Sequence, residues 1–218
     1  GRVWTGSEPA PVFRSGGAIL VGGSSSQLQT RSVMFAGCAP NAAACAQAGG
    51  ALMAMNNAAV QLIESTFQGC TSQNAGGALY VYTGATATIT ATVFDRNTGL
   101  SSRGGAIEIA NAGAEVQLLG GTNVFRGNIA NKDNWSGEAG HSLYKFGGGT
   151  LIFDICPPAT WQDDASRNSA EKAYVIDNDF TGCPYACEIS GVTTSNTYAE
   201  RKATSSETFC TTPCPVGF

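Results

Sequence analysis

The chain repeats a short unit, Gly-Gly-Ala followed by an aliphatic residue, which begins at residues 16, 49, 76 and 104. A degenerate fifth copy, Gly-His-Ser-Leu, begins at residue 140. Each interval also carries a Phe three residues before Cys or Asn, at residues 35–38, 67–70, 94–97 and 125–128. Two units recurring in the same order every 27 residues or more are typical of a solenoid, in which each repeat packs on its neighbours.

The apolar residues between these units follow a period of two, which indicates strands rather than helices. Leu79 and Val81 alternate with tyrosines, and Val60 and Leu62 flank Gln61. Several short strands per repeat, stacked in parallel from one repeat to the next, form a parallel β-helix. The sequence therefore predicts an all-β solenoid over residues 1–155.

Stacked coils place equivalent residues about 4.8 Å apart, so like residues form columns. We expect one inward aliphatic column and one aromatic column, formed respectively by Ile19, Leu52, Leu79, Ile107 and Leu143, and by Phe35, Phe67, Phe94 and Phe125. Asn97 and Asn128 form a side-chain ladder in a slot that Cys38 and Cys70 also occupy. The glycine pair allows a tight corner. We interpret these units as architectural, without chemistry of their own.

Side chains that face outward differ between the strands of a coil. The middle strands present Gln29, Gln61, Thr88 and Gln117, an ordinary polar face. The strands after each Gly-Gly-Ala unit instead present an apolar and aromatic set, with Glu108 among it. Exposed apolar area marks contact sites, so this set is the predicted partner-binding surface: Leu20, Met53, Met55, Tyr80, Tyr82, Tyr144 and Phe146. The alternatives are that the C-terminal segment covers it, or that a carbohydrate stacks on the tyrosines.

The two units together resemble the GGA[ILV] and FxxN repeats of the chlamydial polymorphic outer membrane proteins, over residues 16–155. Similar repeats occur in secreted surface proteins of algae and other protists. The resemblance implies a right-handed single-stranded parallel β-helix, here of about five coils, on an extracellular protein used for adhesion, assembly or display. Cys38 and Cys70 depart from the Asn of that pattern, which favours the disulfide-bearing eukaryotic variants.

Eight cysteines, an even number, fit a disulfide framework in an oxidising compartment: Cys38, Cys45, Cys70, Cys156, Cys183, Cys187, Cys210 and Cys214. Cys38 is within reach of either Cys45 or Cys70; the insertion that carries Cys45 favours the first pairing. After residue 155 the repeat stops and the charge rises, so residues 156–218 are expected to form a disulfide-rich capping and linking segment. Asn134-Trp135-Ser136 is a glycosylation sequon, which suits an exposed loop.

The sequence favours a non-catalytic module of a larger secreted or surface protein, without metal or cofactor. Its four acids between residues 16 and 130 do not share a column, and the single histidine, His141, replaces a repeat glycine. The alternative is a carbohydrate-active enzyme or carbohydrate-binding β-helix of the pectate-lyase kind. A net charge of −4 without a Lys/Arg cluster argues against nucleic acid, and no apolar run is long enough for a transmembrane helix.

Overall fold

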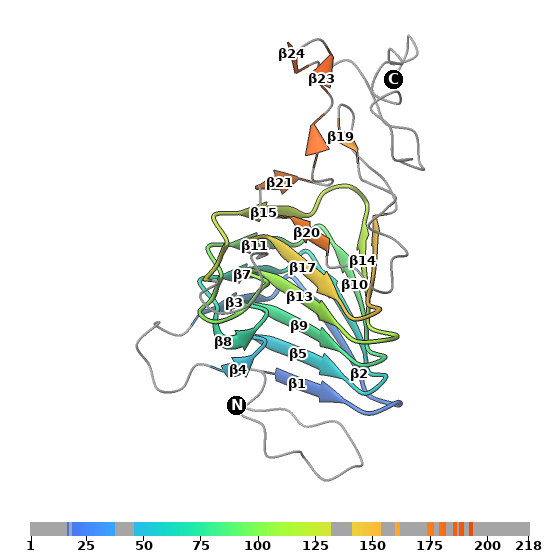
Figure 1. Cartoon of the computed structure of the whole chain (residues 1–218). Coiled ribbons are helices and arrows are strands. Elements are labelled where there is room, and N and C mark those ends of the chain that lie inside the picture. Colours follow the sequence, from blue (N-terminus) through green and yellow to red (C-terminus); the bar gives the residue numbers. More distant parts are fainter. Residues whose placement is uncertain are drawn as a thin grey trace.

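The computed structural model describes residues 17, 19–37, 46–131 and 141–153, and short pieces of the C-terminal part at residues 160–161, 174–176, 179–181, 185–186, 188–189 and 192–193. Every regular element in these ranges is a β-strand (Figure 1). Four parallel sheets run along the stack, and each coil contributes one strand to each sheet in turn. This architecture confirms the predicted all-β parallel β-helix.

The first and second sheets each hold five parallel strands, one from every coil. The first sheet contains β1 (Ile19–Gly22), β5 (Leu52–Met55), β9 (Leu79–Tyr82), β13 (Ile107–Ala110) and β17 (Leu143–Phe146). The second sheet contains β2 (Gln27–Arg31), β6 (Ala59–Ile63), β10 (Thr86–Thr90), β14 (Glu115–Leu119) and β18 (Thr150–Phe153).

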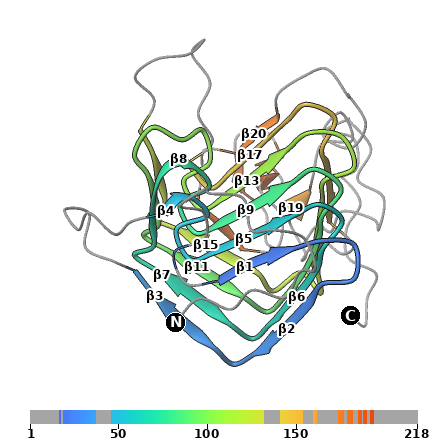
Figure 2. The same cartoon turned by 90° about the horizontal axis from the view of Figure 1, so that it is seen from below.

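The third and fourth sheets each hold four parallel strands, so the described chain makes four complete turns and part of a fifth. The third sheet contains β3 (Met34–Ala36), β7 (Thr66–Gln68), β11 (Val93–Asp95) and β15 (Val124–Arg126). The fourth contains β4 (Ala46–Ala48), β8 (Thr71–Ala75), β12 (Thr98–Gly99) and β16 (Ile129–Ala130). Figure 2 shows the first three sheets as the sides of a triangle, with the fourth at the corner between the third and the first.

The predicted columns are confirmed by the strand register. The aliphatic column joins Ile19 to Leu52, Leu79, Ile107 and Leu143 across successive coils. The phenylalanine rings stack almost parallel, with centroids 4.5 Å apart for Phe35 and Phe67, 5.0 Å for Phe67 and Phe94, and 4.8 Å for Phe94 and Phe125. Both columns lie in one continuous core.

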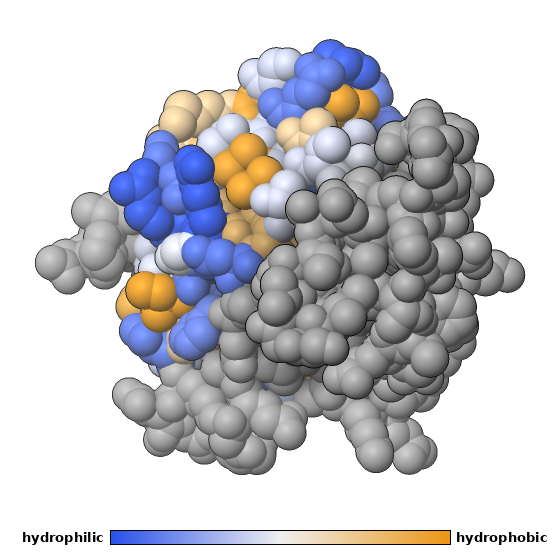
Figure 3. Space-filling model, turned by 90° about the horizontal axis from the view of Figure 1, so that it is seen from above, coloured by the Kyte–Doolittle hydropathy of each residue, from blue (hydrophilic) through white to orange (hydrophobic). Residues whose placement is uncertain are grey.

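Two strands from the C-terminal part continue these columns in the reverse chain direction. β20 (Tyr174–Ile176) pairs antiparallel with β17, and β21 (Phe180–Thr181) pairs antiparallel with β15. Ile176 thereby adds to the aliphatic column, and the ring of Phe180 stacks 4.4 Å from that of Phe125. At this end of the stack the described surface mixes hydrophilic and hydrophobic residues (Figure 3). Strands β20 and β21 therefore cover the core where the parallel coils stop.

The remaining described strands form two short antiparallel pairs. β19 (Thr160–Trp161) pairs with β22 (Tyr185–Ala186), and β23 (Glu188–Ile189) pairs with β24 (Val192–Thr193). The cysteines expected to staple this segment lie outside the described residues.

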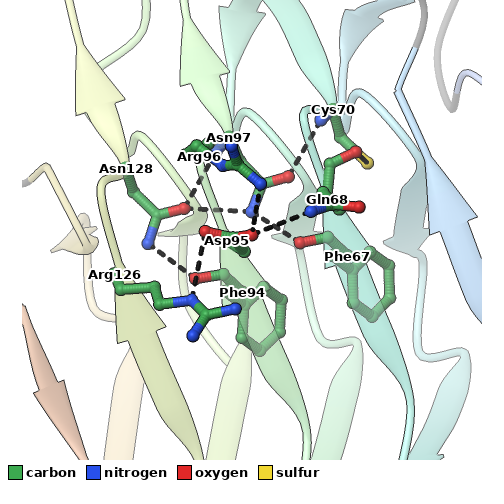
Figure 4. Close-up of polar contacts among 9 residues, drawn as sticks. All are labelled: Phe67, Gln68, Cys70, Phe94, Asp95, Arg96, Asn97, Arg126 and Asn128. Atoms are coloured by element: carbon green, nitrogen blue, oxygen red, sulfur yellow. Dashed lines mark hydrogen bonds and ion pairs between the residues drawn. The ribbon is translucent and has the colours of Figure 1, made fainter.

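The asparagine ladder is also confirmed, and its bonds connect three coils (Figure 4). The Oδ1 atom of Asn97 accepts a hydrogen bond from the backbone N–H of Cys70 at 2.9 Å, and its Nδ2 atom donates to the carbonyl of Phe67 at 3.0 Å. Asn128 repeats this pattern one coil on, with the N–H of Asn97 and the carbonyl of Phe94. Each buried asparagine thus satisfies backbone groups of the preceding coil at a corner where the ladder of strands is interrupted.

The second glycine of each unit is required because the next coil lies against it. A Cβ atom on Gly50 would lie 2.0 Å from the carbonyl oxygen of Gly77, and one on Gly77 would lie 1.9 Å from that of Gly105. The first glycine is constrained twice: Gly49 and Gly76 have φ of 59° and 50°, in the left-handed region, and a Cβ atom on either would lie 2.1 Å from a backbone carbonyl oxygen. Both glycines therefore lie too close to backbone carbonyls for a side chain, and the first glycine of the second and third units also has a left-handed backbone angle.

His141 stands where the last unit has its second glycine, as the sequence predicted. In the described chain no parallel coil stacks beyond it, because the antiparallel β20 follows there instead. Its ring Nδ1 accepts a hydrogen bond from the N–H of Ala130 at 3.0 Å. A side chain is tolerated at this corner because the strand that would exclude it is missing from the parallel stack.

Removing one ring from the aromatic column tests how much the fold depends on it. Phe94→Ala leaves a cavity between two stacked rings at a position with no exposed surface, so we expect a loss of about 3–5 kcal/mol in the free energy of unfolding. Met34→Ala is the matched control, because Met34 lies in the same sheet but is 62% exposed; it should change stability by about 0.5 kcal/mol or less. Urea denaturation measures both, and equal losses would contradict the importance of the column.

Candidate functional site: the outer face of the first sheet

The predicted partner-binding residues all lie on the outer face of the first sheet, but not all of them are accessible. Met53, Met55 and Tyr144 are buried, with 5%, 8% and 3% of their surface exposed. The expectation that these three side chains are exposed was wrong. The other four are partly exposed and form the accessible remainder of the face: Leu20, Tyr80, Tyr82 and Phe146. We call Leu20, Tyr80 and Tyr82 the aromatic rim.

The chain itself covers the two methionines. Met53 and Met55 form a second apolar cluster with Ala48 and Ala75, the last residues of β4 and β8. The backbone reverses sharply at Gly49 and Gly76, so the end of each fourth-sheet strand folds over the outer face of the first sheet. The ends of β4 and β8 therefore cover Met53 and Met55. The sequence analysis had considered only the C-terminal segment, a protein partner or a carbohydrate as the cover.

The aromatic rim rests on this buried layer. Leu20, Tyr80 and Tyr82 pack against the methionine cluster, and the two tyrosine rings lie 5.4 Å apart, tilted by 32°. Burial, followed by the nearby charge of Glu108, raises the pKa of Tyr80 above its ordinary value. Both tyrosine rings thus pack on the methionine cluster while remaining partly exposed to solvent.

Arg103 packs against the two aromatic side chains of β17 on the same face. The Arg103 guanidinium lies 5.4 Å from the ring centre of Tyr144 and 5.3 Å from that of Phe146. It also donates a hydrogen bond to the hydroxyl of Tyr144 at 3.1 Å. Arg103 belongs to the short segment of residues 100–103 between β12 and the next Gly-Gly-Ala unit, so this segment lies against the aromatic side chains of β17.

Glu108 is a residue whose role the sequence analysis missed. It lies between Tyr80 and Tyr144 in register, and only 5% of its surface is exposed. Its Oε2 atom accepts hydrogen bonds from the Ser102 hydroxyl at 3.0 Å and from the Gly76 N–H at 3.3 Å. Burial raises the pKa of this carboxyl, while those hydrogen bonds act in the opposite direction. The signal in the sequence was an acid in an otherwise apolar column.

Lys145 is a second unexpected ionisable group. It pairs in register with Ile109 in an inward position, and 1% of its surface is exposed. Burial lowers the pKa of its ammonium group, because removal from water disfavours the charged form. It occupies the last parallel coil, beside the strand β20 that closes the stack.

The other acids considered as catalytic candidates are bound by separate partners. Glu64 follows the second sheet and pairs with Arg31 at 3.3 Å, and Glu115 accepts a hydrogen bond from Gln117. Asp95 lies on the third sheet, where Arg96, Gln68 and Arg126 hold it (Figure 4). Burial alone would raise the pKa of Asp95, but these hydrogen bonds hold it below its ordinary value. Within the described ranges no three acidic, histidine or cysteine side chains form a possible metal site.

Among the predicted disulfide residues only Cys70 lies in the described part of the chain. It is buried in the slot that Asn97 and Asn128 occupy in later coils, with its sulfur 3.5 Å from the carbonyl oxygen of Phe35. The other seven cysteines, and the sequon residue Asn134, lie outside the described residues. The pairing of Cys38 with Cys45 or Cys70 remains a prediction.

Comparison with models of protein families, with curated proteins and with solved structures found no match to this chain. In the described residues no helix has the length and apolar character needed to cross a membrane. The geometry of the outer faces is therefore the basis for any statement about function.

The raised pKa of Glu108 predicts a specific pH dependence of stability. The folded chain binds this proton more tightly than the unfolded chain, so the stabilisation is complete below the ordinary value of 4.5 and is lost as pH rises through the folded-state pKa. Glu108→Gln cannot ionise and lacks this loss. We expect the unfolding free energy of the variant, relative to wild type, to increase between pH 4.5 and 7.

Urea denaturation at several pH values measures this slope. Glu115→Gln is the control, because Glu115 lies in the same coil and is half-exposed. A Glu108→Gln curve that runs parallel to the wild-type curve would show that the buried carboxyl does not titrate as described.

Proposed function

We propose that this chain is a non-catalytic structural module of a larger extracellular protein, and that it assembles with a protein partner through the aromatic rim. The partner on which we base the test is a second copy of the chain. The resemblance to repeats of polymorphic outer membrane proteins and the even number of cysteines support the setting. The outer face of the first sheet supports the mode of assembly.

The single observation that carries the proposal is the aromatic pair fixed on a buried methionine layer. Tyr80 and Tyr82 pack against Met53 and Met55 while both rings stay partly exposed. Tyrosines held in this way lose little conformational entropy on binding, which is the property of interface anchors. Leu20 extends the same apolar strip by one step along the stack.

The rigidity of the solenoid is a second support. The phenylalanine column and the asparagine ladder fix each coil relative to the next, so the spacing of surface residues along the axis is constant. A module of this kind holds contact residues at fixed separations without needing reactive groups. Glu64, Asp95 and Glu108 are each engaged by separate neighbours, which is consistent with a structural role.

The double variant Tyr80→Ser/Tyr82→Ser tests the rim. Wild-type protein should show a mass above that of the 22.3 kDa chain in size-exclusion chromatography with light scattering, and the variant should elute as a monomer. The dissociation constant of the self-assembled protein should rise about tenfold or more, because truncating tyrosines that anchor an interface costs about 2 kcal/mol or above.

Met34→Ser is the matched control, because it removes a more exposed apolar side chain from a different sheet. It should leave the mass unchanged, and circular dichroism should show unaltered strand content in all three proteins. A monomeric wild type, or a double variant with the wild-type mass, would contradict self-assembly through this rim.

A further inference from the structure

A groove lies on the outer face of the second sheet, away from the aromatic rim. Its volume is about 480 Å³, within the range of ligand sites. Strands β2, β6 and β10 of three successive coils line it, with outward side chains of Gln27, Gln29, Ala59, Gln61, Thr86 and Thr88. The sequence analysis treated this face as an ordinary polar surface.

The hollow has a simple cause in the strand register. Ala59 lies directly between Gln27 and Thr86, so a one-carbon side chain separates two longer ones. Two residues further along the same strands, Gln29, Gln61 and Thr88 pair in register across the three coils. The floor at Ala59 is therefore flanked by amide and hydroxyl groups at regular strand spacing.

The column of Gln29, Gln61 and Thr88 beside the hollow has unused hydrogen-bonding capacity. The amide Nε2 of Gln29 donates to Oε1 of Gln61 at 2.7 Å. Among the residues that the structure describes, the NH2 group of Gln61 and the carbonyl of Gln29 make no further hydrogen bond. Thr88 adds a hydroxyl, which both donates and accepts. Donors and acceptors thus stand side by side along the groove.

The described lining contains no charged side chain. Charged side chains border this lining without entering it, because Arg31, the next outward residue after Gln29 on β2, is paired with Glu64, and Glu115 pairs in register with Thr86. The next coil marks a boundary, because Gln117 continues the Gln29–Gln61–Thr88 column but its amide donates to Glu115. The neutral hydrogen-bonding surface therefore covers the first part of β2, β6 and β10 and is bordered by the Arg31–Glu64 pair and by Glu115.

We infer that this groove binds a neutral, hydroxyl-rich glycan chain lying across β2, β6 and β10. Sugar hydroxyls donate and accept in close succession, which matches the mixed amide and hydroxyl lining and the absence of charge in the described groove. The inference is independent of assembly through the aromatic rim, because the two surfaces belong to different sheets.

Titration of isotope-labelled protein with neutral oligosaccharides, followed by NMR of the glutamine side-chain amides, tests the inference. The probes are cellohexaose, xylohexaose and laminarihexaose, with hexagalacturonate as the charged comparison, each at about 5 mM so that millimolar dissociation constants are visible. At least one neutral probe should shift the NH2 signals of Gln29 and Gln61 more strongly than hexagalacturonate does.

Matched variants separate the groove from the rest of the surface. Gln29→Ala/Gln61→Ala should weaken the binding of that probe about tenfold, since two hydrogen-bonding groups are lost. Gln117→Ala, in the same column but beyond the groove, should bind as wild type does. The inference is overturned if none of the neutral probes binds, if hexagalacturonate binds best, or if the double variant binds as tightly as wild type.

Discussion

The structure depends on vertical registry, the stacking of each residue on its counterpart in the next coil. Backbone hydrogen bonds set the strand spacing, and the phenylalanine rings at 4.4 to 5.0 Å match it. Because the spacing is fixed, any position that faces the next coil closely must be small. The carbonyl of Gly77 excludes a side chain from Gly50 for this reason. Registry thus explains the repetition of the motif as well as the shape of the fold.

The same registry explains how the solenoid ends. The columns continue into β20 and β21, where Ile176 and Phe180 take the aliphatic and aromatic positions although the chain runs the other way. Strand pairing thus reverses at this end while both core columns continue. His141 is accommodated at the same boundary because no parallel coil stacks against its corner in the described chain.

Registry also makes the outer faces of the solenoid different from one another. On the first sheet, sharp reversal at Gly49 and Gly76 brings strand ends over the methionines and leaves the aromatic rim half-exposed. On the second sheet, an alanine between longer residues leaves a polar groove. One repeating backbone therefore supports two chemically different surfaces, the apolar one for which we propose a protein partner and the polar one for which we propose a glycan.

The prediction from sequence was most accurate where neighbours in the same column determine the environment of a residue. The spacing of the glycines, phenylalanines and asparagines was sufficient to place Leu79, Phe94 and Asn97 in their columns. It was insufficient for Met53 and Tyr144, which alternation placed outside the core but which other parts of the chain bury. Glu108 was missed for a related reason, because its partners Ser102 and Gly76 come from corners rather than from its own strand.

The sequence by itself determined the parallel β-helix and its inward columns, because a period of two along the strand and a longer repeat along the chain specify both. Only the tertiary structure decided which outward residues stay accessible and how the stack is closed. Those outcomes depend on contacts between corners, insertions and the C-terminal strands, whose positions in space no local pattern encodes. A repeat defines what lies above and below a residue, and the path of the chain between repeats defines what lies beside it.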